Sequence, residues 1–317
     1  MNEMHMIPIR RAMTRGAQYL VDRQQPDGYW RDYALLPGAG SDWVTAFVGH
    51  ALSGAACGHA EPIALGLSAL EASCRVSGWG YNDKVATDAD SSAWATRWYA
   101  RIGMPMPIDA VDCLAAYLGA EGGARTFASA PRYGRWIQEH ADVTAALGLA
   151  LIESGADAAL IARLRQWALS HRNRDGLWTS FWWSFDGYAA ALMLEFLAAS
   201  GGIPRDVIEA AQRELRSMGE AATAMERASL LLMALRAGAP HAALLKRLLQ
   251  AQRGDGGWPP SRCLKVPDQQ AASASEPLFE DGAGLMSTAL SLMALQAALA
   301  CAAQRSEAAQ GLIELSA

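Results

Sequence analysis

The apolar positions of the chain gather in six segments that carry almost no polar face. In residues 230–235 and 290–295, for example, nearly every position is Leu, Met or Ala. A helix without a polar face must be buried on every side. We therefore predict six buried helices, each starting at a small or polar residue: these starts are Asp42, Asp90, Asp142, Asp186, Glu226 and Met286.

A second set of segments precedes these helices and shows the helical alternation of apolar and charged residues. They cover residues 9–23, 62–76, 108–118, 158–171, 204–218 and 241–252. Amphipathic helices that alternate with buried ones indicate an outer and an inner ring. No strand-like alternation of useful length occurs. The prediction is an all-α protein, an α6/α6 toroid of six helix pairs in one domain over residues 1–317, with a short C-terminal tail from about residue 303.

The predicted helix pairs are joined by a repeated turn that ends in Asp-Gly-x-Trp. It occurs at residues 24–30, 172–178 and 252–258, with weaker echoes at 77–79 and 134–136. Asp-Gly favours a tight reversal with a positive φ at Gly. The Trp is large enough to pack as a wedge against the next helix pair. We expect these turns to tie the rings together.

Composition narrows the classes of function. The chain has 317 residues, 51% of them hydrophobic, and a net charge of −5. A basic patch for nucleic acid is not expected, and the apolar runs are too short to span a bilayer. The N-terminus lacks the apolar core of a signal peptide. Five cysteines, without metal-binding spacing, fit buried thiols in a cytoplasmic protein.

Carboxylates occur at equivalent places in four of the predicted inner helices. When the helices are aligned, Asp90, Asp142, Asp186 and Glu226 occupy the same early position, and Trp43 occupies it in the first helix. One interpretation is helix capping. The other is that like charges in a shared mouth raise one another's pKa and keep one carboxylic acid protonated near neutral pH.

Aromatic residues are densest just before the fourth buried helix. These residues either form a wall whose π faces stabilise a cation, or fill the end of the helical toroid as part of its core. The candidates for substrate contact are Trp182, Trp183, Phe185, Tyr188, Trp94, Trp98 and Trp43. His140 precedes Asp142 and is a candidate for orienting or reloading an acid, because imidazole titrates near neutrality.

The repeats resemble a known family of proteins. The turns at 24–30 and 252–258 match the Gln-x-x-Asp-Gly-x-Trp repeat of squalene–hopene and oxidosqualene cyclases, and residues 88–93 resemble the Asp-x-Asp-Asp-Thr-Ala motif of class II terpene cyclases. The resemblance implies a Brønsted-acid cyclase or isomerase that acts on a hydrophobic small molecule, such as a prenylated compound. In this reading Asp90 protonates the substrate and Asp88 supports it. Asp186 is the next candidate acid. Ser91 replaces the third Asp, which suggests an easily protonated substrate: an epoxide, a polarised alkene or a carbonyl.

The resemblance also shapes the expected cofactors and partners. Large members of the family enclose the substrate between two toroids, whereas one toroid is predicted here. The cavity must then be closed by a second copy of the chain, by the central funnel of the toroid, or by the long connections 31–41, 122–135 and 259–284. No cofactor or metal is expected, except Mg²⁺ if the substrate carries a diphosphate. Protein prenyltransferases, whose β-subunits carry a looser form of the repeat, use an Asp-x-Cys pair in their zinc site. Residues 281–283 lie near the place of that pair but lack the Cys, so zinc-dependent prenyl transfer is disfavoured. Peripheral membrane contact and a homodimer remain open.

Two rival functions remain on the sequence alone. The toroid is also suited to a non-catalytic hydrophobic binding module or partner subunit. A third reading is an α6/α6 carbohydrate-active enzyme that uses Asp90 and Asp186 as its carboxylate pair. The shape and lining of the central cavity discriminate between these readings.

Overall fold

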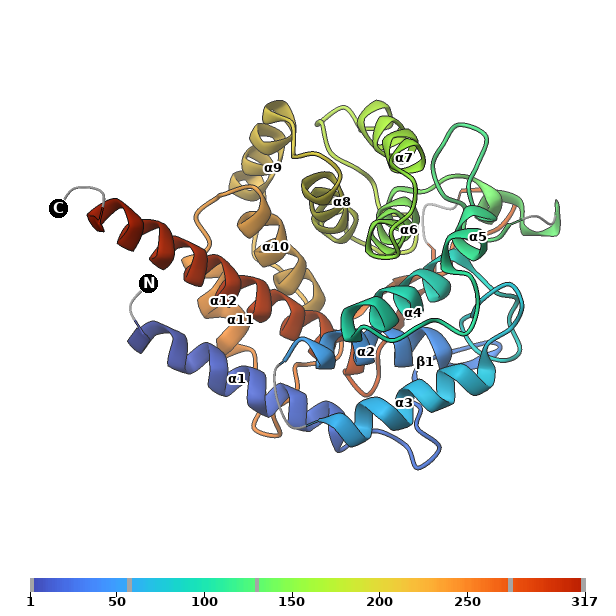
Figure 1. Ribbon diagram of the computed structural model, residues 1–317, viewed down its shortest axis with the longest axis horizontal. Coiled ribbons are helices and arrows are strands. Elements are labelled where there is room, and N and C mark those ends of the chain that lie inside the picture. The colour runs from blue at the N-terminus through green and yellow to red at the C-terminus, as the bar shows by residue number, and fades with distance from the viewer. Residues whose placement is uncertain (1–2, 56–58, 129–130, 273–275, 315–317) are drawn as a thin grey trace.

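Six helices form a closed inner ring in the computed structural model, which describes residues 3–55, 59–128, 131–272 and 276–314. Each inner helix packs against the next, and the last packs against the first (Figure 1). The ring consists of α2 (Asp42–Ser53), α4 (Ala89–Ile102), α6 (Ala141–Glu153), α8 (Gly187–Ala199), α10 (Ala224–Arg236) and α12 (Leu285–Glu314). The predicted α6/α6 toroid is confirmed.

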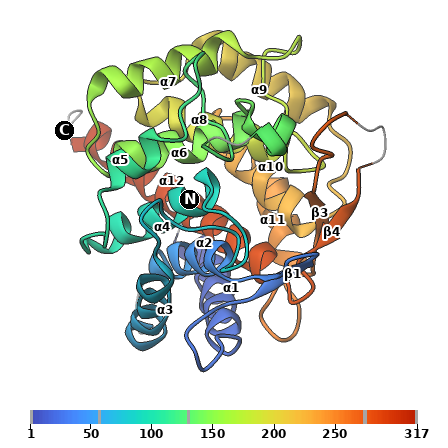
Figure 2. The same ribbon diagram turned by 90° about the vertical axis from the view of Figure 1, so that its right-hand side faces the viewer.

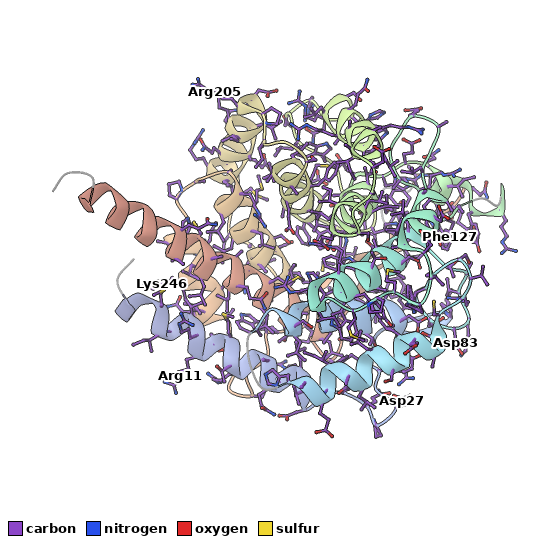
Figure 3. All side chains as sticks on the ribbon, viewed as in Figure 1. Arg11, Asp27, Asp83, Phe127, Arg205 and Lys246 are labelled. Carbon is purple, nitrogen blue, oxygen red and sulfur yellow. The ribbon has the colours of Figure 1, made fainter. Side chains whose placement is uncertain are left out.

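A second set of helices surrounds this ring. It consists of α1 (Glu3–Val21), α3 (Ala60–Ser73), α5 (Ala110–Ala115), α7 (Ala158–Ser170), α9 (Arg205–Ser217) and α11 (Ala242–Gln250). Their charged residues, such as Arg11, Arg205 and Lys246, lie at the periphery of the molecule (Figure 3). Their apolar residues, such as Leu70 and Leu248, are fully buried against the inner ring. The amphipathic pattern therefore reports the position of each helix in the toroid.

The Asp-Gly-x-Trp turns connect α1 to α2, α7 to α8 and α11 to α12. The indole N–H of Trp258 donates to the Leu248 carbonyl at 2.8 Å, and its backbone N–H donates to the Thr288 hydroxyl at 3.0 Å. Trp30 repeats both bonds with its own helices. Gly256 has φ +96°, and a Cβ there would lie 2.5 Å from the Arg15 carbonyl oxygen. Glycine is therefore required at that turn by both conformation and space.

The third repeat departs from this scheme, and the expected turn at 134–136 is wrong. The backbone N–H that donates to the inner-helix threonine, Thr144, is that of Ala124, at 2.8 Å. Ala124 stands where the other turns have their Trp, and the ring of Trp167 lies against the preceding residue, Gly123. Trp136 instead donates its indole N–H to the Pro267 carbonyl at 2.8 Å, so it belongs to a different part of the molecule.

Two short antiparallel hairpins stand at the rim of the ring (Figure 2). They are β1 (Asp32–Leu35) with β2 (Gly38–Gly40), and β3 (Arg262–Lys265) with β4 (Leu278–Glu280). The connection after β3 is hydrogen-bonded to the 3₁₀ turn η1 (Pro131–Ile137): the Arg135 backbone N–H donates to the Gln269 carbonyl at 2.7 Å. The long connections thus hold one another over one end of the toroid.

The last helix continues further than expected. A short tail was predicted from about residue 303, but α12 is helical to Glu314, and residues 315–317 lie outside the described part of the chain. Residues 285–304 of α12 are long and apolar enough to cross a membrane by composition, yet 67% of the hydrophobic window is buried inside the protein. A helix of the inner ring has the same composition for a different reason, which is burial on all sides.

Candidate active site

A cavity of about 260 Å³ opens at the end of the toroid where α2, α4 and α6 begin. The two hairpins and the connection before η1 complete its wall. Its described lining residues are Leu35, Leu36, Pro37, Trp43, Tyr81, Val85, Asp88, Asp90, Ser91, Thr126, Phe127, Trp136, Asp142, Val143, Trp182, Trp183, Leu264, Lys265, Val266 and Phe279. The lining is mostly aliphatic and aromatic, which is typical of a site for an apolar ligand.

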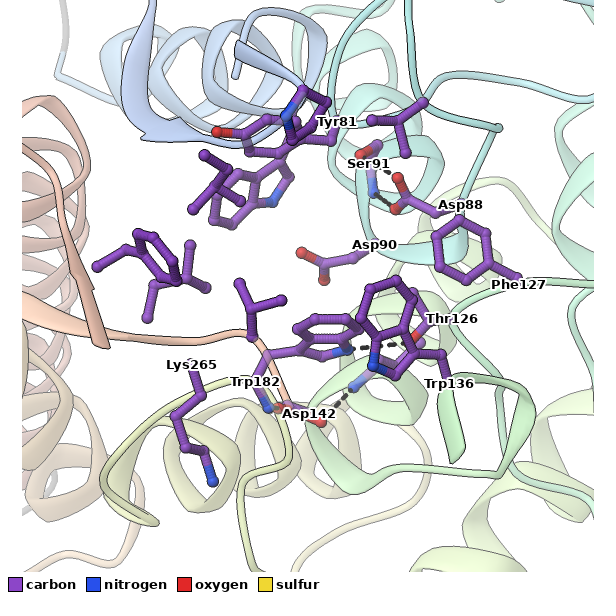
Figure 4. Close-up of a pocket in the computed structure, with 18 of the residues that line it drawn as sticks. Tyr81, Asp88, Asp90, Ser91, Thr126, Phe127, Trp136, Asp142, Trp182 and Lys265 are labelled. Carbon is purple, nitrogen blue, oxygen red and sulfur yellow. Dashed lines mark hydrogen bonds between the residues drawn. The ribbon is translucent and has the colours of Figure 1, made fainter. Parts of the chain in front are cut away.

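The carboxyl group of Asp90 projects alone into the centre of this cavity (Figure 4). Burial raises its pKa well above the ordinary value, and the negative charges of Asp88 and Asp142 add to this rise. The indole N–H groups of Trp43 and Trp94 act in the opposite direction. Neither indole completes a hydrogen bond with any described residue. A raised pKa favours the protonated form of Asp90, which is the form that an acid catalyst requires.

Asp88 is the N-cap residue of α4. Its carboxylate accepts hydrogen bonds from the backbone N–H and the hydroxyl of Ser91, both at 2.8 Å. Burial raises its pKa to about 6, although the two bonds from Ser91 lower it in part. The serine that replaces the third Asp of the motif thus binds the first one. Asp88 supports the start of the helix and places a carboxylate close to Asp90.

Asp142 ties the aromatic segment before α8 to the start of α6. It accepts hydrogen bonds from the backbone N–H groups of Phe181 at 3.0 Å, Trp182 at 2.9 Å and Val143 at 3.1 Å. Burial raises its pKa, while these bonds lower it. Asp142 therefore positions the wall of the cavity and contributes negative charge near Asp90.

Replacing Asp142 by asparagine is expected to destabilise the protein. The asparagine keeps one acceptor oxygen, but its NH₂ group replaces the other. That NH₂ group is a donor and cannot accept a hydrogen bond from a backbone N–H. A buried donor left without a partner costs about 1–3 kcal/mol. The free energy of unfolding, measured in urea, should fall by about that amount. An unchanged free energy of unfolding would contradict the bonds described here.

Three of the predicted aromatic residues form the wall of the cavity. Trp43, Trp182 and Trp183 all line it, and the rings of Trp43 and Trp183 lie 6.2 Å apart between centroids. The indole N–H of Trp182 donates to the Thr126 hydroxyl at 2.9 Å, so its ring has a fixed direction. These side chains present π faces to whatever occupies the cavity.

Two of the predicted carboxylates lie elsewhere, which corrects the alignment of the inner helices. Asp186 is exposed, is itself the N-cap of α8, and accepts a hydrogen bond from the Ser180 backbone N–H. Glu226 forms a capping box with Thr223 at the start of α10. Neither lines the cavity. For Glu226 the capping interpretation is the right one, and Asp186 is not a partner for Asp90.

The other predicted aromatic residues stand behind the wall. Trp98 is core: its indole N–H donates to the Ser53 hydroxyl at 2.8 Å. Phe185 does not line the cavity. Trp94 and Tyr188 are buried one layer deeper, where the Tyr188 ring packs 4.5 Å from that of Trp183. Burial raises the pKa of Tyr188 well above its ordinary value, and the negative charges of Asp90 and Asp142 add to the rise.

His140 does not reach the cavity. Its ring stacks on Phe181 at 3.5 Å between centroids, and its Nε2 pairs with the Arg135 carbonyl at 2.9 Å. Burial lowers its pKa to about 4, so the imidazole is neutral near pH 7. The structure gives it a packing role, not the expected role of orienting or reloading the acid.

The sequence reading missed the residues that the long connections contribute. Phe127 and Trp136 come from the connection 122–137, Leu36 from the first hairpin, and Val266 and Phe279 from the second. The sequence predicts that the long connections cover the cavity, but it does not indicate that these five residues line it. Apolar side chains inside otherwise polar loops were the available signal.

An ion-pair cluster centred on the buried Arg97 lies further along the inner helices from the cavity. Arg97 of α4, only 3% exposed, pairs with Glu153 of α6 at 3.1 Å and with Glu195 of α8 at 2.8 Å. Arg236 of α10 also reaches Glu195, at 3.5 Å. None of these residues lines the cavity. The acid therefore faces the hairpin end of the toroid.

The fold is shared with known terpene cyclases. A structure of type II terpene cyclase MstE from Scytonema, a variant in complex with geranylgeranyl dihydroxybenzoate, superposes with a TM-score of 0.81 at 22% identity, covering 95% of this chain and 100% of that one. ent-Copalyl diphosphate synthase from Streptomyces platensis gives 0.59 at 18% identity, covering 80% and 50%. A glycosidase gives 0.59 at 12% identity, covering 94% and 98%. No family model and no curated protein matches the sequence. The expected likeness to class II terpene cyclases is confirmed in the fold.

Proposed function

We propose that the protein is a class II terpene-cyclase-like enzyme that cyclises or isomerises a prenylated apolar substrate by protonating it. One observation carries this proposal: the carboxyl group of Asp90 projects into an apolar, aromatic cavity that raises its pKa. The shared fold with MstE, whose bound substrate is a geranylgeranyl compound, supports the choice of a prenylated molecule.

The chemistry follows from the groups on the wall. The Asp90 hydroxyl transfers its proton to a terminal alkene carbon, or to an epoxide oxygen, and leaves a carbocation. The next double bond of the chain attacks this cation and closes a ring. The π faces of Trp43, Trp182 and Trp183 stabilise the positive charge by about 0.5–2 kcal/mol each. Loss of a proton from the last cation restores neutrality, so the product is an isomer of the substrate.

The direct test is incubation of the purified protein with prenylated aromatic compounds, followed by chromatography and mass spectrometry. A product with the mass of the substrate but a new retention time, and fewer alkene protons by NMR, supports the proposal. Tight binding without any product would favour the rival function, a non-catalytic binding module. The carbohydrate-active reading pairs Asp90 with Asp186, and Asp186 lies outside the cavity.

The pH dependence of the reaction should show a single alkaline limb. Because the pKa of Asp90 is raised, its protonated form persists at low pH and disappears as the pH rises through that pKa. We therefore expect kcat/KM to fall as pH increases. Asp142→Asn removes a negative charge that raises this pKa, so its limb should move to lower pH. A limb that stays in place would show that Asp142 does not act on the acid.

Replacing Trp183 by leucine should change the products more than the stability. Leucine keeps much of the apolar surface but removes the π face beside the cation. Turnover should fall about tenfold, corresponding to about 1.4 kcal/mol, and by-products from early proton loss or water capture should appear. Phe185→Leu is the matched control, because Phe185 lies in the same segment but outside the cavity. Equal product profiles in both variants would show that Trp183 only packs.

We also propose that residues 1–317 act as one domain, in which the hairpins and the connection 122–137 enclose the substrate in place of a second toroid.

The proton source is Asp90 itself, so no resident cofactor is needed. The described cysteines are free thiols, as in a cytoplasmic protein.

A further inference from the structure

The orientation of the substrate follows from the position of the acid. Asp90 must meet the reacting end of the prenyl chain in the interior of the cavity, beside the buried rings of Trp43 and Trp183. The other end of the substrate, its head group, then lies nearer the mouth. Leu36, which is fully exposed, and the half-buried Trp136 mark that mouth. The chemistry of the mouth therefore selects the head group.

The charges around the cavity are unfavourable for an anion. Three carboxylic acids, Asp88, Asp90 and Asp142, line it, and Lys265 is the one basic residue among its described lining residues. The Lys265 ammonium points away from the cavity (Figure 4) and donates to the Ser180 carbonyl at 3.1 Å. A diphosphate bound in this space would find carboxylates instead of the cationic forks that recognise phosphate.

The arginines of this region already make contacts within the protein: the guanidinium of Arg132 donates to the Tyr133 hydroxyl at 3.1 Å and lies 4.9 Å from the centre of the Tyr133 ring. Arg75 donates to the Val85 carbonyl at 2.6 Å, and Arg135 donates to the Asp268 carbonyl at 3.2 Å and pairs with Glu276 at 3.4 Å. Among the described residues, no group of three or more His, Cys, Asp and Glu side chains is placed to hold a metal ion that would bridge to a diphosphate. The mouth therefore offers little compensation for negative charge.

What the mouth offers instead is a stack of aromatic rings. Phe127 and Tyr133 stack at 4.2 Å between centroids with planes 13° apart, and Phe127 and Trp136 at 5.9 Å with planes 27° apart. Trp136 also lies 5.3 Å from Trp182. Both indole N–H groups are used elsewhere, on Pro267 and Thr126. Trp136 and Trp182 thus present π surface, without free donors, to the substrate.

We propose that the head group of the substrate is an uncharged aromatic ring that stacks against Trp136 and Phe127 at the mouth of the cavity, and not a diphosphate or a carboxylate. This inference rests on the proposed function for the orientation of the substrate. It concerns binding, however, and is tested without turnover.

The test uses the Asp90→Asn variant, so that ligands are bound without being consumed, and measures equilibrium dialysis of isotope-labelled ligands below their micelle concentrations. The four probes share one chain: geranylgeranyl hydroquinone, geranylgeranyl dihydroxybenzoate, geranylgeranyl diphosphate and geranylgeraniol. The hydroquinone should bind at least tenfold more tightly than the other three. If either anion binds as tightly as the hydroquinone, or more tightly, the claim that the head group is uncharged is overturned. If geranylgeraniol binds as tightly as the hydroquinone, the claim that the head group is an aromatic ring is overturned. Binding of none of the four overturns the inference as a whole.

Variants at the mouth locate the effect. Adding Trp136→Leu should weaken hydroquinone binding at least fivefold and leave geranylgeraniol within twofold, while Trp136→Phe should restore most of the loss. Lys265→Gln should leave all four affinities within twofold; a selective loss of anion binding would overturn the proposal. If the hydroquinone binds as expected but the wild-type protein forms no cyclised product from it, the proposed function fails while the head-group assignment stands.

Discussion

Replacing Asp90 by asparagine is expected to lower the rate of cyclisation by about 100-fold or more, because a positioned general acid contributes about 10²–10⁴-fold. Asparagine has nearly the same shape as the protonated aspartic acid and can still donate a hydrogen bond, but it cannot transfer a proton to carbon. Folding and ligand affinity should therefore change little. The measurements are single-turnover rates, urea unfolding and ligand binding on the same preparation.

Two further carboxylates serve as comparisons for that result. Asp88→Asn should be milder, because Asp88 caps α4 and acts on Asp90 without giving up its own proton. Asp186→Asn should leave the rate within about twofold, since this exposed side chain lies outside the cavity. If Asp90→Asn retains turnover within tenfold, the acid is another group, and Asp142 is the next carboxylate on the wall.

Replacing Trp258 by alanine is expected to lower the free energy of unfolding by about 3–5 kcal/mol, the range for truncating a large buried aromatic side chain. Trp258 is 0% exposed and joins α11 to α12 through two hydrogen bonds. The alanine would leave both a cavity and an unpaired Leu248 carbonyl. Urea unfolding followed by far-UV circular dichroism measures the loss.

The phenylalanine variant separates packing from hydrogen bonding at the same position. Trp258→Phe keeps an aromatic ring and loses the bond to the Leu248 carbonyl, so it should cost about 1–3 kcal/mol. A loss below about 1 kcal/mol for the alanine variant would show that the turns do not hold the rings together.

The helices of the toroid could be predicted from the sequence because burial determines their composition. A segment such as 230–235 is apolar on all sides only if it stands in the inner ring, and α10 contains it. The repeated turns then fixed the order of the helices. The turn in the third repeat could not be recognised, because Ala124 takes the place of its Trp and keeps only the backbone bond to Thr144.

Which carboxylate faces the cavity could not be predicted, because it depends on where each helix begins. The wall is reached two residues after the N-cap: Trp43 follows Ser41, Asp90 follows Asp88, and Asp142 follows His140. In α8 and α10 the same position holds Tyr188 and Met225, since these helices are capped by Asp186 and Thr223. A shift of one or two residues at a helix start turns a side chain by 100° or more.

That Trp136 lies at the mouth of the cavity could not be predicted from the sequence, for another reason. Trp136 owes its place to contacts with the chain near Pro267, which is 131 residues away. Nothing in the local pattern of residues 122–137 indicates that contact. Loops that fold against each other carry no periodicity from which the direction of a side chain can be read.

The central claim, cyclisation started by a proton from Asp90, is tested most directly by running the reaction in D₂O with a prenylated substrate that ends in an alkene. Between turnovers the carboxylic acid exchanges with solvent, so each product molecule should gain one deuterium on a carbon that was part of the terminal alkene. Mass spectrometry and NMR should then show a product one mass unit heavier than the substrate, labelled at that carbon. A cyclised product without deuterium, or one formed with loss of the head group, would contradict the account.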